Sequence, residues 1–215
     1  MTEDQQHIIS ASFDQNIKMW NVDSGECVKT LTGHTDQVRS IFLSRDQQQI
    51  ISASADKTIK TWNLDTGECV KTLTGHRGWV NSVVMTKDEQ YIISASGDYT
   101  IKIWNLATGE CVKTLTGHTN FVISIVITED QQHIISAGFD QTIKIWKIAS
   151  GECVKTLTGH TDSIRSILVT KDQQHIISGS DDQTIKIWKI ASGECIKSWI
   201  GHKSIIMSLA YSFTN

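Results

Sequence analysis

The sequence repeats one set of residues, Gly33-His34, Ser52, Asp56 and Trp62, at a fixed interval. The same residue types return at 75–76, 94, 98 and 104, at 117–118, 136, 140 and 146, and at 159–160, 178, 182 and 188, so each step is 42 residues. A period of about 40 to 45 residues indicates stacked supersecondary units that share a continuous core. We therefore expect residues 1–215 to form a single repetitive domain.

The two ends of the chain carry the halves of a fifth set. Gly201 and His202 are not followed by a Ser, Asp and Trp at the repeat spacing, and Ser10, Asp14 and Trp20 have no Gly-His pair before them. The repeat predicts four complete units, over residues 34–75, 76–117, 118–159 and 160–201. A composite fifth unit is expected from residues 202–215 together with residues 1–33.

Each unit is expected to contain four short strands. Residues 7–12, 17–20, 27–31 and 38–43 are apolar or alternating runs, separated by turn-forming Asp, Asn, Ser and Gly. Strands such as residues 49–54 are apolar on both sides of the pleat, so each sheet needs a neighbour on both faces, which radial stacking supplies. We therefore predict an all-β fold, a β-propeller of four-stranded antiparallel blades, five per chain. The fifth blade would be completed by the two termini, with a strand over residues 206–213 paired to one over residues 6–12.

The charge pattern argues against several classes of partner. The chain has 20 Lys and Arg, 23 Asp and Glu, and a formal net charge of -3, with the two signs interspersed. No basic stretch is long enough to follow a phosphate backbone, so no nucleic-acid partner is expected. The first six residues are polar and no apolar run approaches roughly 18 residues, so neither a signal peptide nor a membrane partner is expected.

Three further columns of residues, of Cys, Lys and Glu, repeat with the same step. The cysteines stand at 27, 69, 111, 153 and 195, too far apart in the expected fold for disulfides, which need Cα atoms within about 7 Å. Reduced thiols favour a cytoplasmic protein. The lysines at 29, 71, 113, 155 and 197 are expected to form a solvated rim on the outermost strands, balanced by a column of Glu.

Taken together, the motifs resemble those of the WD40-repeat family over the whole chain. They are the Gly-His pair, the Ile-Ser-Ala-Ser/Gly run, the Asp of the next turn and the Thr-Ile-Lys-Ile-Trp run. The Asp that follows the Trp in that family is replaced by Asn at 21, 63 and 105 and by Lys at 147 and 189. The resemblance implies WD40-type blades and a non-catalytic scaffold that binds a protein or peptide partner without a cofactor.

The resemblance also implies that the His, Ser, Asp and Trp of each unit are linked by hydrogen bonds. Buried His and Asp are costly unless each satisfies the other, which fits this role. The implied sets are His34, Ser52, Asp56, Trp62; His76, Ser94, Asp98, Trp104; His118, Ser136, Asp140, Trp146; His160, Ser178, Asp182, Trp188; and the composite His202, Ser10, Asp14, Trp20.

Catalysis and metal binding are the alternatives to this structural role. Ser, His and Asp together suggest a catalytic triad, but a hydrolase needs one exposed nucleophile in a cleft, not five near-identical buried sets. We therefore expect no enzyme and no catalytic residues. The eight histidines belong to two repeated columns that cannot converge on one ion, so no metal site is expected.

The positions at which the units differ are the candidates for a binding surface. In the family that this chain resembles, the residues flanking the first strand and the residue before the turn Asp face the channel rim, where partners dock. The candidate partner-binding residues are Trp79, Phe121, Phe139, Phe13, Arg39, Arg165, Asp181 and Ile205. Aromatic and Arg side chains are typical of interaction hot spots. Ile123 and Met207, in the same columns, fit a channel-filling core equally well.

Two other functions stay open at this point. Pairing of the end halves between chains would make the protein a self-assembling propeller fragment and a homo-oligomer. A sugar-binding propeller with five equal pockets is the third interpretation. No aromatic residue outside the Trp column recurs in every unit to support it.

Overall fold

A computed structural model describes residues 6–210, which form strands, turns and loops with no helix. The strands in this part of the chain make five antiparallel sheets, each a meander in sequence order. The first sheet holds β1 (His7–Ala11), β2 (Ile17–Asn21) and β3 (Cys27–Leu31). The second holds β4 (Val38–Leu43), β5 (Gln49–Ser54), β6 (Ile59–Asn63) and β7 (Cys69–Leu73), and the third holds β8 (Val80–Met85), β9 (Tyr91–Ser96), β10 (Ile101–Asn105) and β11 (Cys111–Leu115). The fourth holds β12 (Val122–Ile127), β13 (His133–Gly138), β14 (Ile143–Lys147) and β15 (Cys153–Leu157), and the fifth holds β16 (Ile164–Val169), β17 (His175–Ser180), β18 (Thr184–Lys189) and β19 (Cys195–Ile200).

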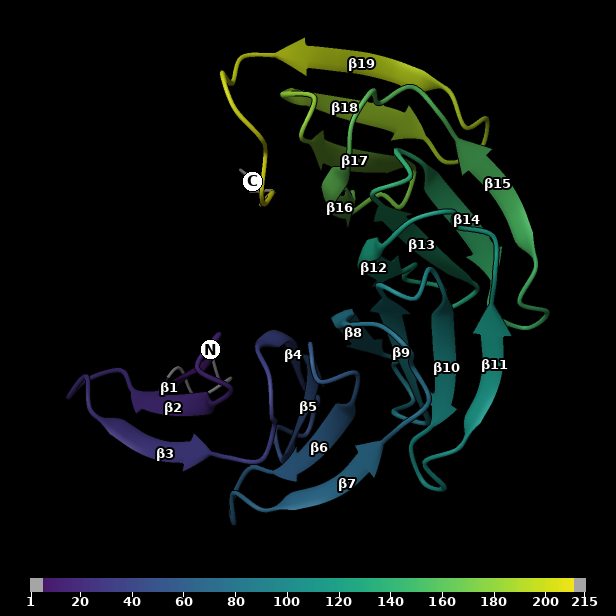
Figure 1. Cartoon of the computed structure of the whole chain (residues 1–215). Helices are drawn as coiled ribbons and strands as arrows, with labels where there is room; N and C mark the ends of the chain where they lie inside the picture. Colours follow the sequence, from purple (N-terminus) through teal and green to yellow (C-terminus); the bar gives the residue numbers. More distant parts are fainter. Residues whose placement is uncertain (1–5, 211–215) are drawn as a thin grey trace. The chain divides into compact units, whose positions relative to one another are not determined.

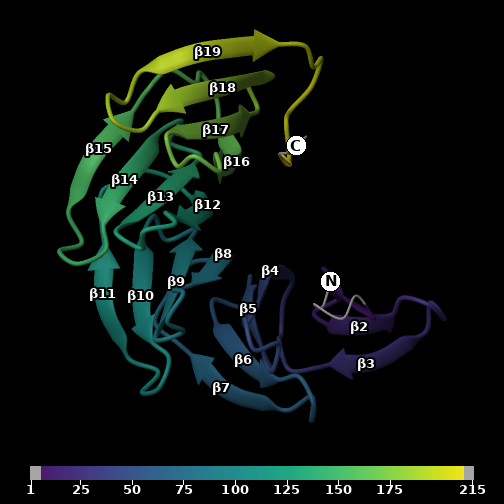
Figure 2. The same ribbon diagram turned by 180° about the vertical axis from the view of Figure 1, so that it is seen from behind.

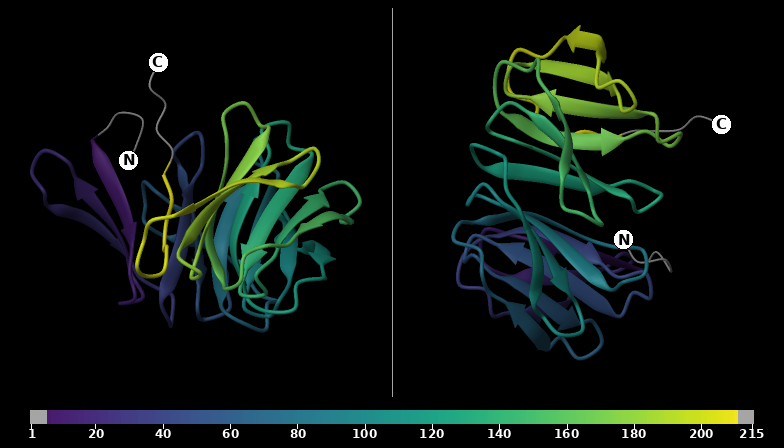
Figure 3. Two further views of the ribbon diagram at one scale, coloured as in Figure 1. Left: turned by 90° about the horizontal axis from the view of Figure 1, so that it is seen from above. Right: turned by 90° about the vertical axis from the view of Figure 1, so that its right-hand side faces the viewer.

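The chain divides into two compact units, which are described separately. Of the described residues, 6–96 and 103–112 belong to the first unit, and 97–102 and 113–210 belong to the second. In the first unit β4 packs beside β1, and β8 packs beside β4 and β5 (Figure 1). In the second unit β16 packs beside β12 and β13 in the same way (Figure 2). The strands of each sheet are twisted, as the edge-on views show (Figure 3).

Both faces of the inner sheets are buried, which confirms the all-β prediction of stacked antiparallel sheets. Ile50 and Ile51 are neighbours on β5 and point to opposite faces, yet they are 1% and 0% exposed. One apolar cluster of the first unit joins Ile51 to residues of β8 and β9, and a second joins Ile50 to residues of β2 and β3. In the second unit one cluster joins β13–β15 to β16–β18.

The first sheet has three strands, whereas the other four sheets have four. The expected closing strand over residues 206–213 is not formed in the part that is described: residues 201–210 form no strand, and residues 211–213 lie outside the described residues. A strand requires a ladder of backbone bonds to a neighbouring strand. The segment instead contacts the fifth sheet, where Ile206 N donates to Ser180 O and Leu209 N donates to Ser166 Oγ, both at 3.2 Å. Completion of the fifth blade by the two termini stays a prediction.

A β-bulge recurs where the first strand of each four-stranded sheet begins. The register of β4 on β5 shifts by one residue, which makes Arg39 the extra residue of the bulge. Asn81, Ile123 and Arg165 hold the same place on β8, β12 and β16. Bulges re-aim the side chain of the extra residue, so these four positions differ from the regular strand positions around them.

Candidate functional site

Four side chains of the second sheet form a hydrogen-bonded set. Asp56 Oδ2 lies 2.7 Å from His34 Nδ1, and Ser52 Oγ lies 2.7 Å from His34 Nε2. Trp62 Nε1 donates to the same Ser52 Oγ at 2.8 Å. His34 precedes β4, whereas the other three residues lie on β5, in the next turn and on β6. The set therefore ties the entering loop to the interior of the sheet.

The set determines the protonation of His34. An ionised carboxylate only accepts hydrogen bonds, so Nδ1 carries the proton that is donated to Asp56. Ser52 Oγ accepts the indole N–H of Trp62 and donates its own proton to Nε2. Burial lowers the pKa of His34 despite the opposing hydrogen bond and charge of Asp56, which favours the neutral ring. Both ring nitrogens are thereby engaged, and neither is free to act as a base.

Similar sets occur in the other four-stranded sheets. The contacts are His118 Nδ1 with Asp140 Oδ2 and Nε2 with Ser136 Oγ, and His160 Nδ1 with Asp182 Oδ2 and Nε2 with Ser178 Oγ, all at 2.7 Å. Trp146 and Trp188 donate to the same serines at 2.8 Å. In the third sheet, His76 Nε2 and Trp104 Nε1 each lie 2.8 Å from Ser94 Oγ.

The aspartates of two sets are strongly acidic. Burial acts to raise the pKa of Asp140, but the hydrogen bonds from His118, Thr119 and Thr142 outweigh it and lower the pKa to about 2. For Asp182 the balance between burial and hydrogen bonding likewise gives a pKa of about 2. Both carboxyl groups are therefore ionised acceptors across the ordinary pH range.

The composite set is only partly assembled in the described residues. Trp20 Nε1 donates to Ser10 Oγ at 2.8 Å. Asp14 is exposed and accepts from the backbone N of Asn16 at 3.0 Å, and His202 is exposed.

The candidate partner-binding residues lie at the end of the sheets where the first strand begins and the second ends. Backbone bonds of 2.8 Å close this end, from Ala55 N to Gln37 O, from Phe139 N to Phe121 O and from Asp181 N to Ser163 O. The residue before the first strand and the residue before the turn Asp are thereby neighbours in each of these sheets.

In the second unit, five side chains form a continuous stack at this end. The rings of Phe121 and Phe139 are stacked, with centroids 5.7 Å apart, and Tyr99 lies 5.8 Å from Phe121. The guanidinium carbon of Arg165 lies 4.6 Å from the centre of the Phe139 ring. Asp181 accepts from Nε of Arg165 at 2.9 Å and from Nη2 at 2.7 Å. These five residues are called the Phe121 patch.

Gly138 permits the close approach in this stack. A Cβ at Gly138 would lie 2.0 Å from the carbonyl oxygen of Phe121, so any larger residue would displace that backbone. The three other four-stranded sheets have Ser54, Ser96 and Ser180 at this position.

In the first unit, Arg39 and Trp79 form a smaller cluster. The guanidinium carbon of Arg39 lies 4.5 Å from the centre of the Trp79 ring, a cation–π contact. Trp79 is 44% exposed. These two residues are called the Trp79 patch.

The remaining candidates are not part of either patch. Phe13, Ile205 and Met207 are exposed, and Ile123 is half-buried. Tyr99, which follows the turn residue Asp98, is not among the residues predicted from the sequence. Comparison of the units held the signal, because the equivalent residues are Gln15, Lys57, Gln141 and Gln183.

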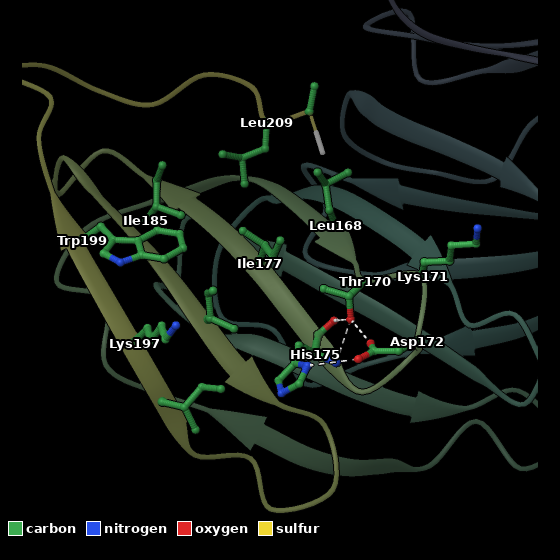
Figure 4. Close-up of a pocket in the computed structure, with 13 residues that line it drawn as sticks. Leu168, Thr170, Lys171, Asp172, His175, Ile177, Ile185, Lys197, Trp199 and Leu209 are labelled. Atoms are coloured by element: carbon green, nitrogen blue, oxygen red, sulfur yellow. Dashed lines mark hydrogen bonds and ion pairs between the residues drawn. The ribbon is translucent and has the colours of Figure 1, made fainter. Parts of the chain in front are cut away.

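A cavity of about 700 Å³ lies on the outer face of the fifth sheet, within the second unit (Figure 4). Four residues of the fourth sheet pack against the fifth sheet: Ile135, Ile143, Ile145 and Leu157. The equivalent residues of the fifth sheet line the cavity: Ile177, Ile185, Ile187 and Trp199. Trp199 is 49% exposed, whereas Leu157 is 3% exposed. The cavity is therefore a sheet face that no following sheet of the second unit covers.

One lysine on the last strand of a sheet ties that sheet to the next. Lys29 Nζ donates to the backbone oxygens of Leu64 and Asp65, both at 2.6 Å. The same paired contact joins Lys71 to Leu106 and Ala107, Lys113 to Ile148 and Ala149, and Lys155 to Ile190 and Ala191. The expectation of a solvated rim is wrong for these four lysines, because their ammonium groups reach turn carbonyls of the neighbouring sheet. Lys197, the fifth member, lines the cavity and has no acceptor among the described residues.

The repeated sequence matches a known family. The family model described as "WD domain, G-beta repeat" matches residues 25–63, 67–105, 109–147 and 151–189. The chain belongs to the WD40-repeat family. This confirms the resemblance inferred from the motifs. WD40-repeat proteins generally act as non-catalytic scaffolds for protein interactions.

Several relatives match this chain over 37 residues. An uncharacterized WD repeat-containing protein of Schizosaccharomyces pombe is 57% identical over 17% of this chain and 10% of its own length. The nuclear distribution proteins PAC1 of Arthroderma otae and Coccidioides posadasii are 49% and 51% identical, each over 17% of this chain and 8% of its own length. The match therefore covers a small part of each of these relatives.

Three further observations concern the WD40 chain between residues 6 and 210. In that range no three His, Cys, Asp or Glu side chains are grouped so that they could hold a metal ion. The same residues include no helix with the length and apolar character needed to cross a membrane. None of the five cysteines, all of which lie in this range, forms a disulfide, and four of them are exposed.

Proposed function

We propose that this WD40-repeat chain is a non-catalytic scaffold that binds a protein or peptide partner through the Trp79 patch and the Phe121 patch. The observation that carries the proposal is the exposure of Trp79, whose ring is held by Arg39 outside the core. Aromatic and Arg side chains are enriched where partners bind. The cysteines form no disulfide among the described residues and are mostly exposed, which supports a cytoplasmic location.

The hydrogen-bonded sets support the non-catalytic part of the proposal. Ser52, Ser94, Ser136 and Ser178 are each 0% exposed, so a substrate cannot reach their hydroxyl groups without unfolding. The Ser52 hydroxyl is shared between His34 and Trp62, which is the bonding of a structural link rather than of a nucleophile.

The test uses peptides selected from a displayed random library against the wild-type chain. We expect Trp79→Ala and Phe121→Ala to weaken their binding by about tenfold or more, as truncation of a hot-spot residue does. Val70→Ala is the matched control, because Val70 is 62% exposed on β7 and belongs to neither patch. Equal binding by the wild type and both patch variants, with folding verified by circular dichroism, would rule the proposal out.

A second candidate function, self-assembly, is favoured by the face of the fifth sheet that no other sheet of the second unit covers. We propose that a second copy covers this face with its own β1–β3 sheet. The contact that joins successive sheets needs the two turn carbonyls that follow the last-but-one strand of a sheet. In the first sheet this is the β2–β3 turn, and the carbonyls belong to Val22 and Asp23. Val22 is 41% exposed, whereas Leu64, its equivalent in the next sheet, is 8% exposed. Lys197 of one copy would donate to these two carbonyls of the other.

Light scattering over a range of concentrations tests this second candidate. We expect a mass of at least twice the 24.0 kDa of one chain, and a return to one-chain mass for Trp199→Glu. Val112→Glu is the control, because Val112 is 50% exposed on β11 and its replacement leaves the β16–β19 face intact. A constant mass of one chain at all concentrations would contradict self-assembly and leave the scaffold proposal standing.

A further inference from the structure

Arg39 and Arg165 hold equivalent places in two units, three steps of the repeat apart. Each is the extra residue of a β-bulge, and each guanidinium lies over an aromatic ring, at 4.5 Å from Trp79 and 4.6 Å from Phe139. The two arginines differ in the hydrogen-bond acceptors that lie in the plane of the guanidinium group.

Arg165 is neutralised within the chain. Asp181 accepts from its Nε and Nη2 in the two-pronged arrangement that suits a guanidinium and a carboxylate. The hydrogen bond and charge of Asp181 raise the pKa of Arg165 against the effect of burial. The ion pair is therefore complete, with the side chains 26% and 10% exposed.

Arg39 has no such carboxylate. The residue equivalent to Asp181 is Ala55, which is 3% exposed and offers only a methyl group. Arg39 Nη2 donates to Gln37 Oε1 at 3.1 Å, but its Nε is buried and has no hydrogen-bond partner. A buried N–H of a charged group without an acceptor costs free energy, and an incoming acceptor recovers it.

We infer that Arg39 is the recognition site for a carboxylate of the protein partner, an Asp or Glu side chain that takes the place Asp181 holds beside Arg165. Trp79 holds one face of the guanidinium and, being exposed, also offers its ring to an apolar neighbour of that acidic residue. The inference rests on the proposed function, since it specifies the chemistry of the partner that the Trp79 patch would bind. A guanidinium fork matches a planar carboxylate with two parallel hydrogen bonds, which a lysine could not provide.

To test this inference, peptides that bind the wild-type chain are selected from a displayed random library and their sequences are determined. We expect an enriched Asp or Glu in the peptides whose binding depends on Trp79. Ala55→Asp should weaken these peptides by about tenfold or more, because it supplies an internal carboxylate to Arg39, while Ala55→Asn should weaken them much less. Arg39→Lys should also weaken them, whereas the matched change Arg45→Lys, at an exposed arginine outside both patches, should not.

The outcomes separate this inference from the proposed function. Trp79-dependent peptides with no acidic enrichment, or with equal affinity for the Ala55→Asp variant, would overturn the carboxylate site and leave the scaffold intact. Peptides with no dependence on either patch would overturn both. If Ala55→Asp does not fold, Arg39→Gln provides the same comparison, since it keeps a polar side chain and removes the charged fork. Peptides with an amidated C-terminus distinguish a side-chain carboxylate from a terminal one.

Discussion

The fourth and fifth sheets carry the same repeat motifs, yet their outer faces differ in what lies against them. Ile143 on β14 is 0% exposed and Leu157 on β15 is 3% exposed, because the fifth sheet covers them. On the fifth sheet, Ile185 is half-buried and Trp199 is 49% exposed. Whether a side chain is buried in this chain therefore depends on the neighbouring sheet that covers it and not on the strand that carries it. The same substitution should have unequal effects in the two sheets.

The largest difference is expected for a core isoleucine. Ile143→Ala should lower the free energy of unfolding by about 2–5 kcal/mol, since it leaves a cavity between two packed sheets. Ile185→Ala should cost less than half as much, because its side chain already contacts solvent. Urea denaturation of both variants at low protein concentration measures this. Equal losses would break the comparison and would mean that the outer face of the fifth sheet is covered in solution.

A smaller difference is expected between a complete hydrogen-bonded set and the composite one. Asp140→Asn should cost about 1.5–3 kcal/mol, because the replaced carboxylate accepts charge-assisted bonds from His118 and Thr142. Asp14→Asn should change the stability by at most about 0.5 kcal/mol, as expected for an exposed residue. Thermal unfolding of the two variants provides the measurement. A large loss for Asp14→Asn would show that the composite set is complete in solution.

Lowering the pH should remove part of the stabilisation that the hydrogen-bonded sets of His, Ser, Asp and Trp provide. Burial lowers the pKa of His34 and His160, so the unfolded chain takes up protons before the folded chain does. Their contribution is complete above about pH 6.5 and decreases as the pH falls below that value. Asp140 and Asp182, with a pKa of about 2, lose their contribution only as the pH falls from about 3.8 toward 2. Unfolding free energies measured on either side of pH 6.5 should show the first loss, with a shallower slope in His34→Gln. An unchanged slope in that variant would contradict this assignment.

The smallest difference concerns the lysines between sheets. Lys155→Met should cost about 0.5–1.5 kcal/mol, since it leaves the backbone oxygens of Ile190 and Ala191 without their donor. Lys197→Met should have no measurable effect on an isolated chain, because Lys197 has no acceptor among the described residues. A pair of urea titrations at one protein concentration compares them. A loss for Lys197→Met that grows with protein concentration would sharpen the case for a second copy.

The fold class could be predicted because the repeated sequence pattern indicates which segments form strands and that these strands pair in sheets. Strand positions follow from runs such as residues 49–54, and the need for two covered faces follows from Ile50 and Ile51 standing side by side. The contacts between sheets could not be predicted from the same pattern. The lysine column was expected in solvent, since a strand period does not show how far one sheet is offset from the next. That offset brings Lys71 to the carbonyls of Leu106 and Ala107.

The patches were predictable in part. Comparison of the units identified Trp79, Phe121, Phe139 and the two arginines, because their columns vary. Tyr99 was missed because the residue after the turn Asp was not compared. The role of Gly138 was invisible for another reason: a Ser-to-Gly change in one unit has no consequence until the 2.0 Å approach to Phe121 is known. The difference between Arg39 and Arg165 likewise depends on knowing which residue lies beside each bulge.

The lysine contact has a consequence for how such chains change in length. Within the two compact units, every join between sheets uses the same parts, a lysine from one sheet and two turn carbonyls from the next. A 42-residue segment that is duplicated or lost as a whole recreates the same join at each of its borders. Copy number can therefore change in whole steps without compensating substitutions in the flanking sheets, which makes it accessible both to recombination and to protein engineering.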